Sequence, residues 1–209
     1  MSIMKKVSTM TSDQYRILTP SEWEAFRDAI PKARLRAVMD GLLFTGMRYT
    51  EFARFADSLK WFDPKNRAIV LPATATKTGK ERTVQLTPAS TKSLSQYLRE
   101  YKTLEVPHIT VMNHNMKRWW YLCFEGNYEN MDRTLNMEWY PTPKTLRKTW
   151  ESWLLFVKQE DGRPKYDSLM IADSQGHSQT IQLNHYMNMS ARLKSEAEAV
   201  RRLTEGWGT

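Results

Sequence analysis

The 209-residue chain lacks the features that mark several large classes of protein. It has a single cysteine, Cys123, which excludes an intramolecular disulfide framework and a cysteine-rich zinc module. No run of about 18 apolar residues is present, so the sequence predicts no membrane span. Residues 1–6 are not followed by an apolar stretch, so we expect no secretory signal peptide and a cytoplasmic protein.

The spacing of metal ligands is also missing. Neither the single cysteine nor the four histidines follow a metal-ligand pattern; the histidines are His108, His114, His177 and His185. We therefore expect no metal and no other cofactor. The sequence shows no internal repeat and no low-complexity segment.

What the chain does have is an excess of positive charge. It carries 31 Lys and Arg against 23 Asp and Glu, a formal net charge of +8, and its isoelectric point is about 9.5. A basic balance of this size suits a polyanionic partner, and nucleic acid is the first candidate. Many soluble proteins are basic without such a partner, so charge alone leaves both interpretations open.

The length suits one domain with small appendages. Hydrophobic residues make up 41% of the chain, which is enough for a core. Residues 1–18 are polar and weakly patterned, and we expect an N-terminal arm or the remnant of a linker there. The main domain is expected at 19–190 and a C-terminal tail helix at 191–209.

Most of the chain shows residues that typically begin or end helices, and apolar residues at helical spacing. Thr19, Pro20 and Glu22 combine a helix cap, a proline at the first helical position and an acid at the third, which predicts a helix from there to about Ile30. A second helix is expected from about residue 32 to Gly46, a glycine in a usual C-terminal position. Further helices are expected at about 50–57, 87–101, 114–123, 142–158, 167–173, 178–188 and 191–204.

Between the early and the middle helices the periodicity changes to that of strands. Three short strands are expected at 59–62, 68–71 and 82–86, joined by a turn at 63–66 and by a lysine-bearing connection. The predicted fold class is therefore α+β, mainly α, with a small three-stranded antiparallel sheet inserted among the helices.

Two cations share one face at the start of a predicted helix. Lys144 and Arg147 are three residues apart, clear of the apolar stripe of that helix. A helix N-terminus carries partial positive charge and free N–H groups, so it suits a phosphate. The alternative for this pair alone is a solvated basic helix start.

Two further cations lie in loops. Arg48 follows Gly46 and precedes a helix, where a guanidinium can grip two phosphate oxygens; the alternative is a surface arginine paired with Glu51. Lys77 lies in the connection between two strands, where it can enter a DNA groove or protonate a leaving oxygen. Lys80 and Arg82 are its rivals in the same connection.

Tyr186 follows His177 by nine residues. A phenol has a pKa near 10, so as a nucleophile it needs nearby cations or a base. Several cations around one phosphate would also stabilise a pentacoordinate transition state. Taken singly, a histidine is more often structural and a tyrosine near the C-terminus more often packs in the core.

In their order, these motifs resemble the catalytic domain of the tyrosine recombinases, the phage integrase family. Residues 45–51 (TGMRYTE) are similar to the family's first arginine box, and 76–82 (TKTGKER) to its catalytic hairpin, which favours Lys77 over Lys80. Residues 142–149 (TPKTLRKT) are similar to its second box, usually H-x-x-R. Residues 176–178 (GHS), with Tyr186, are similar to its last box and nucleophile. The resemblance covers about residues 19–190.

The resemblance implies a site-specific DNA recombinase or integrase. Such an enzyme cuts and rejoins strands through a 3′-phosphotyrosyl intermediate, without ATP or metal. It implies catalytic roles for Arg48, Lys77, Lys144, Arg147, His177 and Tyr186, and DNA contacts by Lys80, Arg82 and Lys148. The expected partner is double-stranded DNA in the host cell, on which four protomers assemble. The tail helix, around Leu193, Ala197, Val200 and Leu203, is then a candidate for docking on a neighbour.

The sequence departs from the family pattern in two ways. Lys144 stands where the family usually has histidine, as in some archaeal and viral members; a charged lysine binds phosphate but cannot accept a proton from the phenol. The helical core-binding domain that usually precedes the catalytic domain does not fit into residues 1–18. The chain is therefore expected to be a catalytic fragment or a minimal enzyme that relies on a partner.

Three other functions share part of this pattern. A type IB topoisomerase uses the same chemistry but religates the same strand. A DNA-binding module with a decayed active site would retain the positive charge but lose catalytic residues. The candidate residues other than Lys144 keep the residue types usual in the family, which argues against decay. A rolling-circle relaxase or nuclease needs a metal cluster, which the sequence does not predict.

Overall fold

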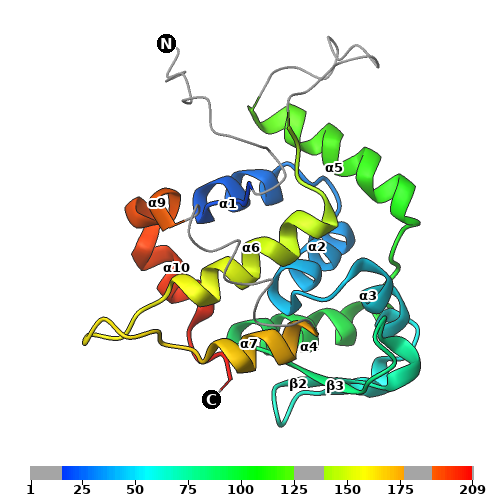
Figure 1. The fold of residues 1–209 in the computed structure, drawn as a ribbon. Coiled ribbons are helices and arrows are strands. Elements are labelled where there is room, and N and C mark those ends of the chain that lie inside the picture. Colours follow the sequence, from blue (N-terminus) through cyan, green and yellow to red (C-terminus); the bar gives the residue numbers. More distant parts are fainter. Residues whose placement is uncertain (1–15, 125–138, 177–189, 209) are drawn as a thin grey trace.

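The computed structural model describes residues 16–124, 139–176 and 190–208. Within these ranges the chain is mainly helical, with one small sheet at an edge of the molecule (Figure 1). The α-helices are α1 (Pro20–Asp28), α2 (Ala33–Thr45), α3 (Tyr49–Ala56), α4 (Pro88–Tyr101), α5 (Ile109–Phe124), α6 (Pro143–Phe156), α7 (Ser168–Gln175), α9 (Ser190–Leu193) and α10 (Ala197–Thr204). Short 3-10 helices occur at η2 (Leu59–Trp61), η3 (Ala73–Ala75) and η5 (Lys194–Glu196).

Threonine–proline pairs start three of the helices. Thr19 caps α1, and its side chain and that of Glu22 form the reciprocal capping box that the sequence predicts. Thr87 and Thr142 cap α4 and α6 in the same manner, each with proline at the first helical position. The N-terminus of α6, which carries the predicted phosphate-binding pair, is therefore fixed by local sequence.

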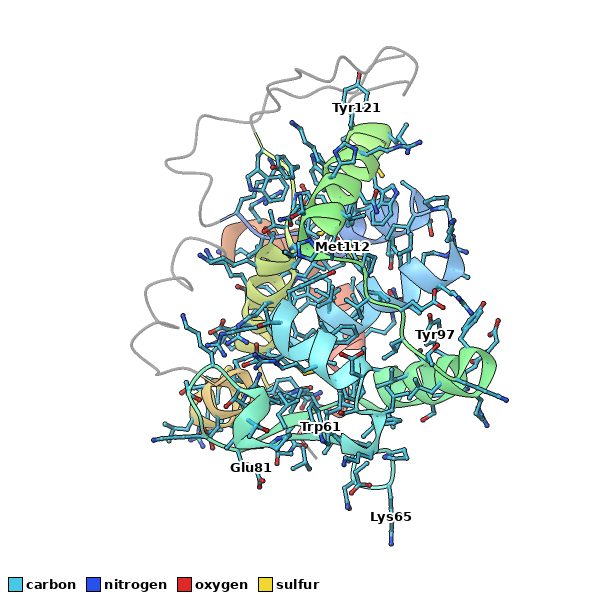
Figure 2. The ribbon with its side chains drawn as sticks, turned by 90° about the vertical axis from the view of Figure 1, so that its right-hand side faces the viewer. Trp61, Lys65, Glu81, Tyr97, Met112 and Tyr121 are labelled. Atoms are coloured by element: carbon cyan, nitrogen blue, oxygen red, sulfur yellow. The ribbon has the colours of Figure 1, made fainter. Side chains whose placement is uncertain are left out.

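The sheet contains three antiparallel strands, as predicted, in the order β1-β2-β3. Strand β2 (Ala68–Leu71) pairs with β3 (Arg82–Gln85), with Ile69 opposite Val84. The first predicted strand, 59–62, is wrong in most of its length: residues 59–61 form η2, and β1 is only Phe62–Asp63. Figure 2 shows Lys65 and Glu81 projecting from the sheet, away from the body of the molecule.

Helix α6 runs through the centre of the molecule against α2 (Figure 1). Its apolar face buries Trp150 and Trp153 completely. The core also includes Ile17 and Leu18, which are fully buried. The Leu18 backbone N–H donates to Thr149 Oγ1 at 3.1 Å, and Trp153 Nε1 donates to the Leu18 carbonyl at 3.1 Å. The predicted boundary at residue 19 is therefore too late, because residues 17 and 18 belong to the core.

The C-terminal tail packs against its own chain. It is divided into α9, η5 and α10 rather than forming the single helix expected at 191–204. Leu193, Val200 and Trp207 are buried, and Leu203 is half-buried. Trp207 Nε1 donates to the Gln85 carbonyl of β3 at 3.0 Å, which ties the end of the chain to the sheet.

Two other predicted boundaries are corrected by the structure. Helix α5 begins at Ile109, about a turn earlier than expected, and buries Met112 (Figure 2). Helix α7 extends to Gln175 and ends in Gly176, which has a left-handed backbone (φ 68°). The helix expected at 178–188 lies outside the described residues. Among the helices that the structure describes, none is long and apolar enough to cross a membrane.

Candidate active site

Arg48 is held at the start of α3 by its guanidinium and by its backbone N–H. Its Nη1 donates to Glu51 Oε1 at 2.9 Å, and its Nη2 donates to the Gly176 carbonyl at 3.1 Å. The backbone N–H of Arg48 donates to Glu51 Oε2 at 3.0 Å, which helps to fix the first turn of α3. These side-chain contacts use two of the five N–H donors of a guanidinium, so donors remain for a ligand.

Arg147 reaches the same point from α6. Its Nη1 donates to the Gly46 carbonyl at 3.0 Å, and its Nη2 donates to the Gln175 carbonyl. Gly46 is needed here because its backbone is left-handed (φ 59°) and a Cβ would overlap the Gln175 side chain. Arg48 and Arg147 thus hold the successive carbonyls of residues 176 and 175, where α7 ends.

Glu51 lies beneath these arginines and is fully buried. Besides Arg48, it accepts from Arg82 Nη2 at 2.6 Å, and Arg147 Nη1 lies 4.0 Å from its Oε2. Burial opposes its ionisation, but Arg82 and Arg48 outweigh that cost and lower the Glu51 pKa. Glu51 is therefore a carboxylate at neutral pH, surrounded by three guanidinium groups.

A cleft of about 650 Å³ opens over this cluster. Arg48, Lys144, Arg147 and Lys148 all line it, so two motifs almost a hundred residues apart meet in one cavity. Lys144 is exposed at the first turn of α6, and Lys148 is half-buried one turn later. Burial, followed by the nearby Lys144 ammonium, lowers the Lys148 pKa. Such a cationic cavity, at a helix N-terminus, suits an anionic ligand.

Arg147 experiences the repulsion within this cluster most strongly. Its burial lowers the pKa of its guanidinium to about 9, and the Arg48 and Arg82 charges add to the effect. At neutral pH Arg147 still carries its charge. An anion in the cleft would relieve the repulsion and raise this pKa, so the site is electrostatically prepared for a phosphate.

The predicted hairpin cations have two different orientations. Lys77 and Lys80 are exposed in the connection between η3 and β3, where Thr76 Oγ1 donates to the Lys80 carbonyl at 2.8 Å. Neither lysine forms an ion pair within the described residues. Arg82 was predicted to contact DNA, but its side chain is turned inward and is only 7% exposed. It contacts Glu51 and the Ser174 carbonyl instead of solvent.

His177 and Tyr186, the two remaining predicted site residues, lie outside the described residues. The residue before them is placed, because Gly176 accepts a hydrogen bond from Arg48. The chain therefore enters the 177–189 segment directly at the pair of arginines.

The structure adds residues to the site that sequence reasoning did not single out as functional. Glu51 was considered only as a neutralising partner for Arg48, although its position in the first box was a usable signal. Tyr49 and Asn113 also line the cleft. The Tyr49 hydroxyl donates to the Pro107 carbonyl, and burial raises its pKa to about 12. Asn113, on α5, had no sequence signal that distinguished it.

Comparisons with known proteins agree with this arrangement. The model of the phage integrase family matches residues 16–192. Among solved structures, the XerA recombinase is similar with a TM-score of 0.63 and 16% identity, covering 94% of this chain and 67% of that chain. The Tn1549 transposon integrase in complex with transposon right-end DNA is similar with a TM-score of 0.57 and 17% identity, covering 93% of this chain and 69% of that one.

The two kinds of match carry different information. A search of the curated proteins by sequence found no match. The likeness to solved structures at 16% and 17% identity shows the fold, which is the recombinase catalytic-domain fold expected from the sequence. The family model covers most of the chain, including both arginine boxes and Tyr186. The chain therefore belongs to the phage integrase family, whose members are site-specific DNA recombinases of the tyrosine class.

Proposed function

We propose that this chain cleaves and rejoins double-stranded DNA at the cleft between α3 and α6, with Tyr186 as nucleophile. The observation that carries the proposal is the meeting of Arg48 and Arg147 in one cavity, each with N–H donors to spare. Guanidinium groups held in this manner can bind two nonbridging oxygens of one phosphate. The DNA complex of the similar Tn1549 integrase supports DNA as the partner.

The reaction is a transesterification at phosphorus. The Tyr186 phenol gives its proton to solvent water, its oxygen attacks the scissile phosphate, and the bond to the 5′ oxygen breaks. Lys77 protonates that leaving oxygen, which departs as a 5′-hydroxyl. A 5′-hydroxyl of a second strand then attacks the phosphotyrosine, releases the phenol and rejoins the DNA. One phosphoester bond is exchanged for another at each step, so no ATP is needed.

The cations have separate tasks in this proposal. Arg48 and Arg147 stabilise the charge on the pentacoordinate phosphorus, because they are fixed before the substrate arrives. Lys144 and His177 support the phosphate. A lysine in its ammonium form cannot take the phenol proton, so the usual histidine's part as a base is not assigned to Lys144. Lys80 and Lys148 contact the DNA backbone.

The assembly and location follow from the same proposal. We infer that four protomers act together on two DNA sites, and that the protein works on DNA in the cytoplasm, which is that of the host cell if the chain is viral. In the single chain the tail helices are buried against their own domain. Exchange of the tail between protomers would therefore require α9 and α10 to leave this position.

A suicide DNA substrate, nicked beside the scissile phosphate, tests the proposal. Cleavage releases a short fragment, so a covalent protein–DNA adduct should accumulate with the native chain and be absent with Tyr186→Phe. An adduct of undiminished yield with Tyr186→Phe would refute the assignment. Joint molecules from two DNA sites would distinguish recombination from a topoisomerase, which would relax supercoils without producing recombinants.

A further inference from the structure

Arg82 sits where three parts of the site meet. It is the first residue of β3, and its side chain reaches across to α3 and α7. Its Nη2 donates to Glu51 Oε2 at 2.6 Å, and its Nη1 donates to the Ser174 carbonyl. A Cβ on Gly176 would lie 2.9 Å from Arg82 Cδ and Nε, so the turn after α7 is packed directly on the Arg82 side chain.

The contacts of Glu51 connect Arg82 with the phosphate-binding arginine. Glu51 Oε1 accepts from Arg48 Nη1, while Oε2 accepts from Arg82. Because Glu51 is fully buried, its charge must be balanced by these neighbours. Without Arg82, the Glu51 carboxylate would accept additional hydrogen bonds from the Arg48 guanidinium, or it would become protonated and lose its ion pair with Arg48. In either case the Arg48 guanidinium would be displaced from its present position.

The end of α7 provides a second connection. The carbonyls of residues 174, 175 and 176 accept from Arg82, Arg147 and Arg48 respectively. The Gln85 backbone N–H of β3 also donates to Ser174 Oγ at 3.2 Å, so β3 holds residue 174 twice. Arg82 thus fixes the first carbonyl of the series on which the two cleft arginines rest.

We propose that Arg82 is a positioning residue: it does not contact DNA, but holds Arg48 in place through Glu51 and through the end of α7. This inference rests on the proposed strand cleavage and assigns a cation that no part of the mechanism above uses. A misplacement of about 1 Å at a reacting group can cost on the order of 100-fold in rate, so the contribution of Arg82 is expected in the chemical step.

The test compares Arg82→Met, Arg82→Lys and Lys65→Met. Lys65→Met is the control, since it removes a cation from the exposed β1–β2 turn of the same sheet. Two quantities are measured: the rate of adduct formation at saturating suicide substrate, and the affinity for the same DNA at several salt concentrations. We expect Arg82→Met to slow cleavage by about 10- to 100-fold with an unchanged salt slope and an affinity within about twofold. Arg82→Lys should recover part of the rate.

The pH profile separates positioning from general damage to the fold. Arg82 lowers the Glu51 pKa. In Arg82→Met the acid limb of the cleavage rate should therefore move to higher pH, and in Glu51→Gln that limb should disappear. A variant that is merely less stable would keep the position of the limb. If Arg82→Met does not fold, Arg82→Lys is measured instead. Its ammonium does not reproduce the paired bonds of the guanidinium to Glu51 and the Ser174 carbonyl, so a smaller shift of the limb in the same direction is expected.

Two results would overturn the inference. The first is a weaker affinity of Arg82→Met for DNA, with the slope of log affinity against log salt reduced by about one, while the cleavage rate at saturating DNA stays normal. A residue that contacts a phosphate behaves in this manner. The second is an NMR resonance of the Arg48 side-chain N–H that has the same chemical shift in Arg82→Met as in the native chain. This resonance is identified by its absence from the spectrum of Arg48→Lys. The NMR measurement needs no DNA cleavage, so it decides the role of Arg82 even if the native chain forms no adduct.

Discussion

The basic residues of the site form two groups that differ in how they are held. The inner group consists of Arg48, Arg82 and Arg147, whose guanidinium groups are each fixed by at least two hydrogen bonds. The outer group consists of Lys77, Lys80 and Lys144, whose ammonium groups are exposed and form no ion pair within the described residues. Both groups supply positive charge, but only the inner one supplies it at a defined position.

The difference matches the chemistry of the two side chains. Arginine is planar, weakly hydrated and able to bond in several directions, so it can be buried and still present donors to a ligand. Lysine is a strongly hydrated point charge on a flexible stem. We therefore expect loss of an inner arginine to affect the rate of cleavage. Loss of Lys80, the outer lysine without a part in the proposed chemistry, should mainly affect the encounter with DNA.

The largest effect is expected from the inner group. Arg147→Ala should reduce adduct formation by about 100- to 1000-fold, because a preorganised donor to the transition state is lost. Arg147→Lys should restore little, since one ammonium cannot bind the Gly46 and Gln175 carbonyls and a phosphate together. Rates on the suicide substrate at saturating DNA measure this. A rate for Arg147→Ala within a few-fold of the native value would remove the distinction between the groups.

The carboxylate beneath the arginines should matter for stability. Glu51→Gln leaves buried guanidinium groups without their counter-charge, and we expect a loss of about 3 kcal/mol or more. For a chain of this size the melting temperature should fall by about 6 °C or more. Glu81→Gln, on the exposed hairpin, is the matched control and should change little.

The pH dependence of that stability follows from the lowered Glu51 pKa. The contribution of Glu51 is complete above the ordinary carboxyl pKa and is lost as pH falls through the lower value in the folded state. The stabilities of the native chain and Glu51→Gln should therefore converge in acid. A constant difference down to the lowest pH at which the chain folds would contradict this explanation.

High pH should weaken the inner group by removing a proton. The Arg147 pKa is lowered to about 9 by burial and by its two neighbouring arginines. The affinity of Tyr186→Phe for duplex DNA should thus fall above pH 9, by at most about tenfold per pH unit. The Tyr186→Phe background keeps the titrating nucleophile out of the measurement. Adding Arg147→Ala should make this decline shallower and leave the part that comes from Lys148, whose pKa is also lowered.

The smallest effect is expected from Lys80, the outer lysine without a part in the proposed chemistry. Lys80→Met should lower DNA affinity by a few-fold at moderate salt and reduce the slope of log affinity against log salt by about one. The cleavage rate at saturating DNA should stay the same. A tenfold loss of that rate would mean that Lys80, and not only Lys77, takes part in the chemistry.

Sequence patterns predicted the parts of this molecule that depend on local interactions. The threonine–proline helix starts, Gly46 at the end of α2 and the β2–β3 pairing all follow from residues within a few positions. The start of α5 was missed because His108, whose Nδ1 accepts from the Thr110 N–H at 3.4 Å, is not one of the residue types that usually signal a helix start. Residues 59–61 were predicted as a strand because Leu59 and Trp61 flank a polar Lys60, which is a strand-like alternation, although they form a 3-10 helix.

The long-range arrangement was predicted only in part. The meeting of Arg48 with Arg147 followed from the order of motifs, and the structure brings them together. The inward direction of Arg82 did not follow, because a basic residue beside two exposed lysines has no local feature that distinguishes it. Nor did the burial of Glu51, which depends on arginines from β3 and α6 that only the tertiary fold delivers.

The burial of Leu18 has a practical consequence for truncation. A truncated protein that begins at α1 would lack Leu18, whose backbone makes two hydrogen bonds to α6, and would expose Trp153 to solvent. It would also delete Arg16, whose guanidinium lies 4.1 Å from the Trp139 ring centroid. Since α6 also carries Arg147, loss of the Leu18 contacts would loosen the helix that positions this arginine in the cleft. Any trimmed version should therefore begin upstream of Arg16.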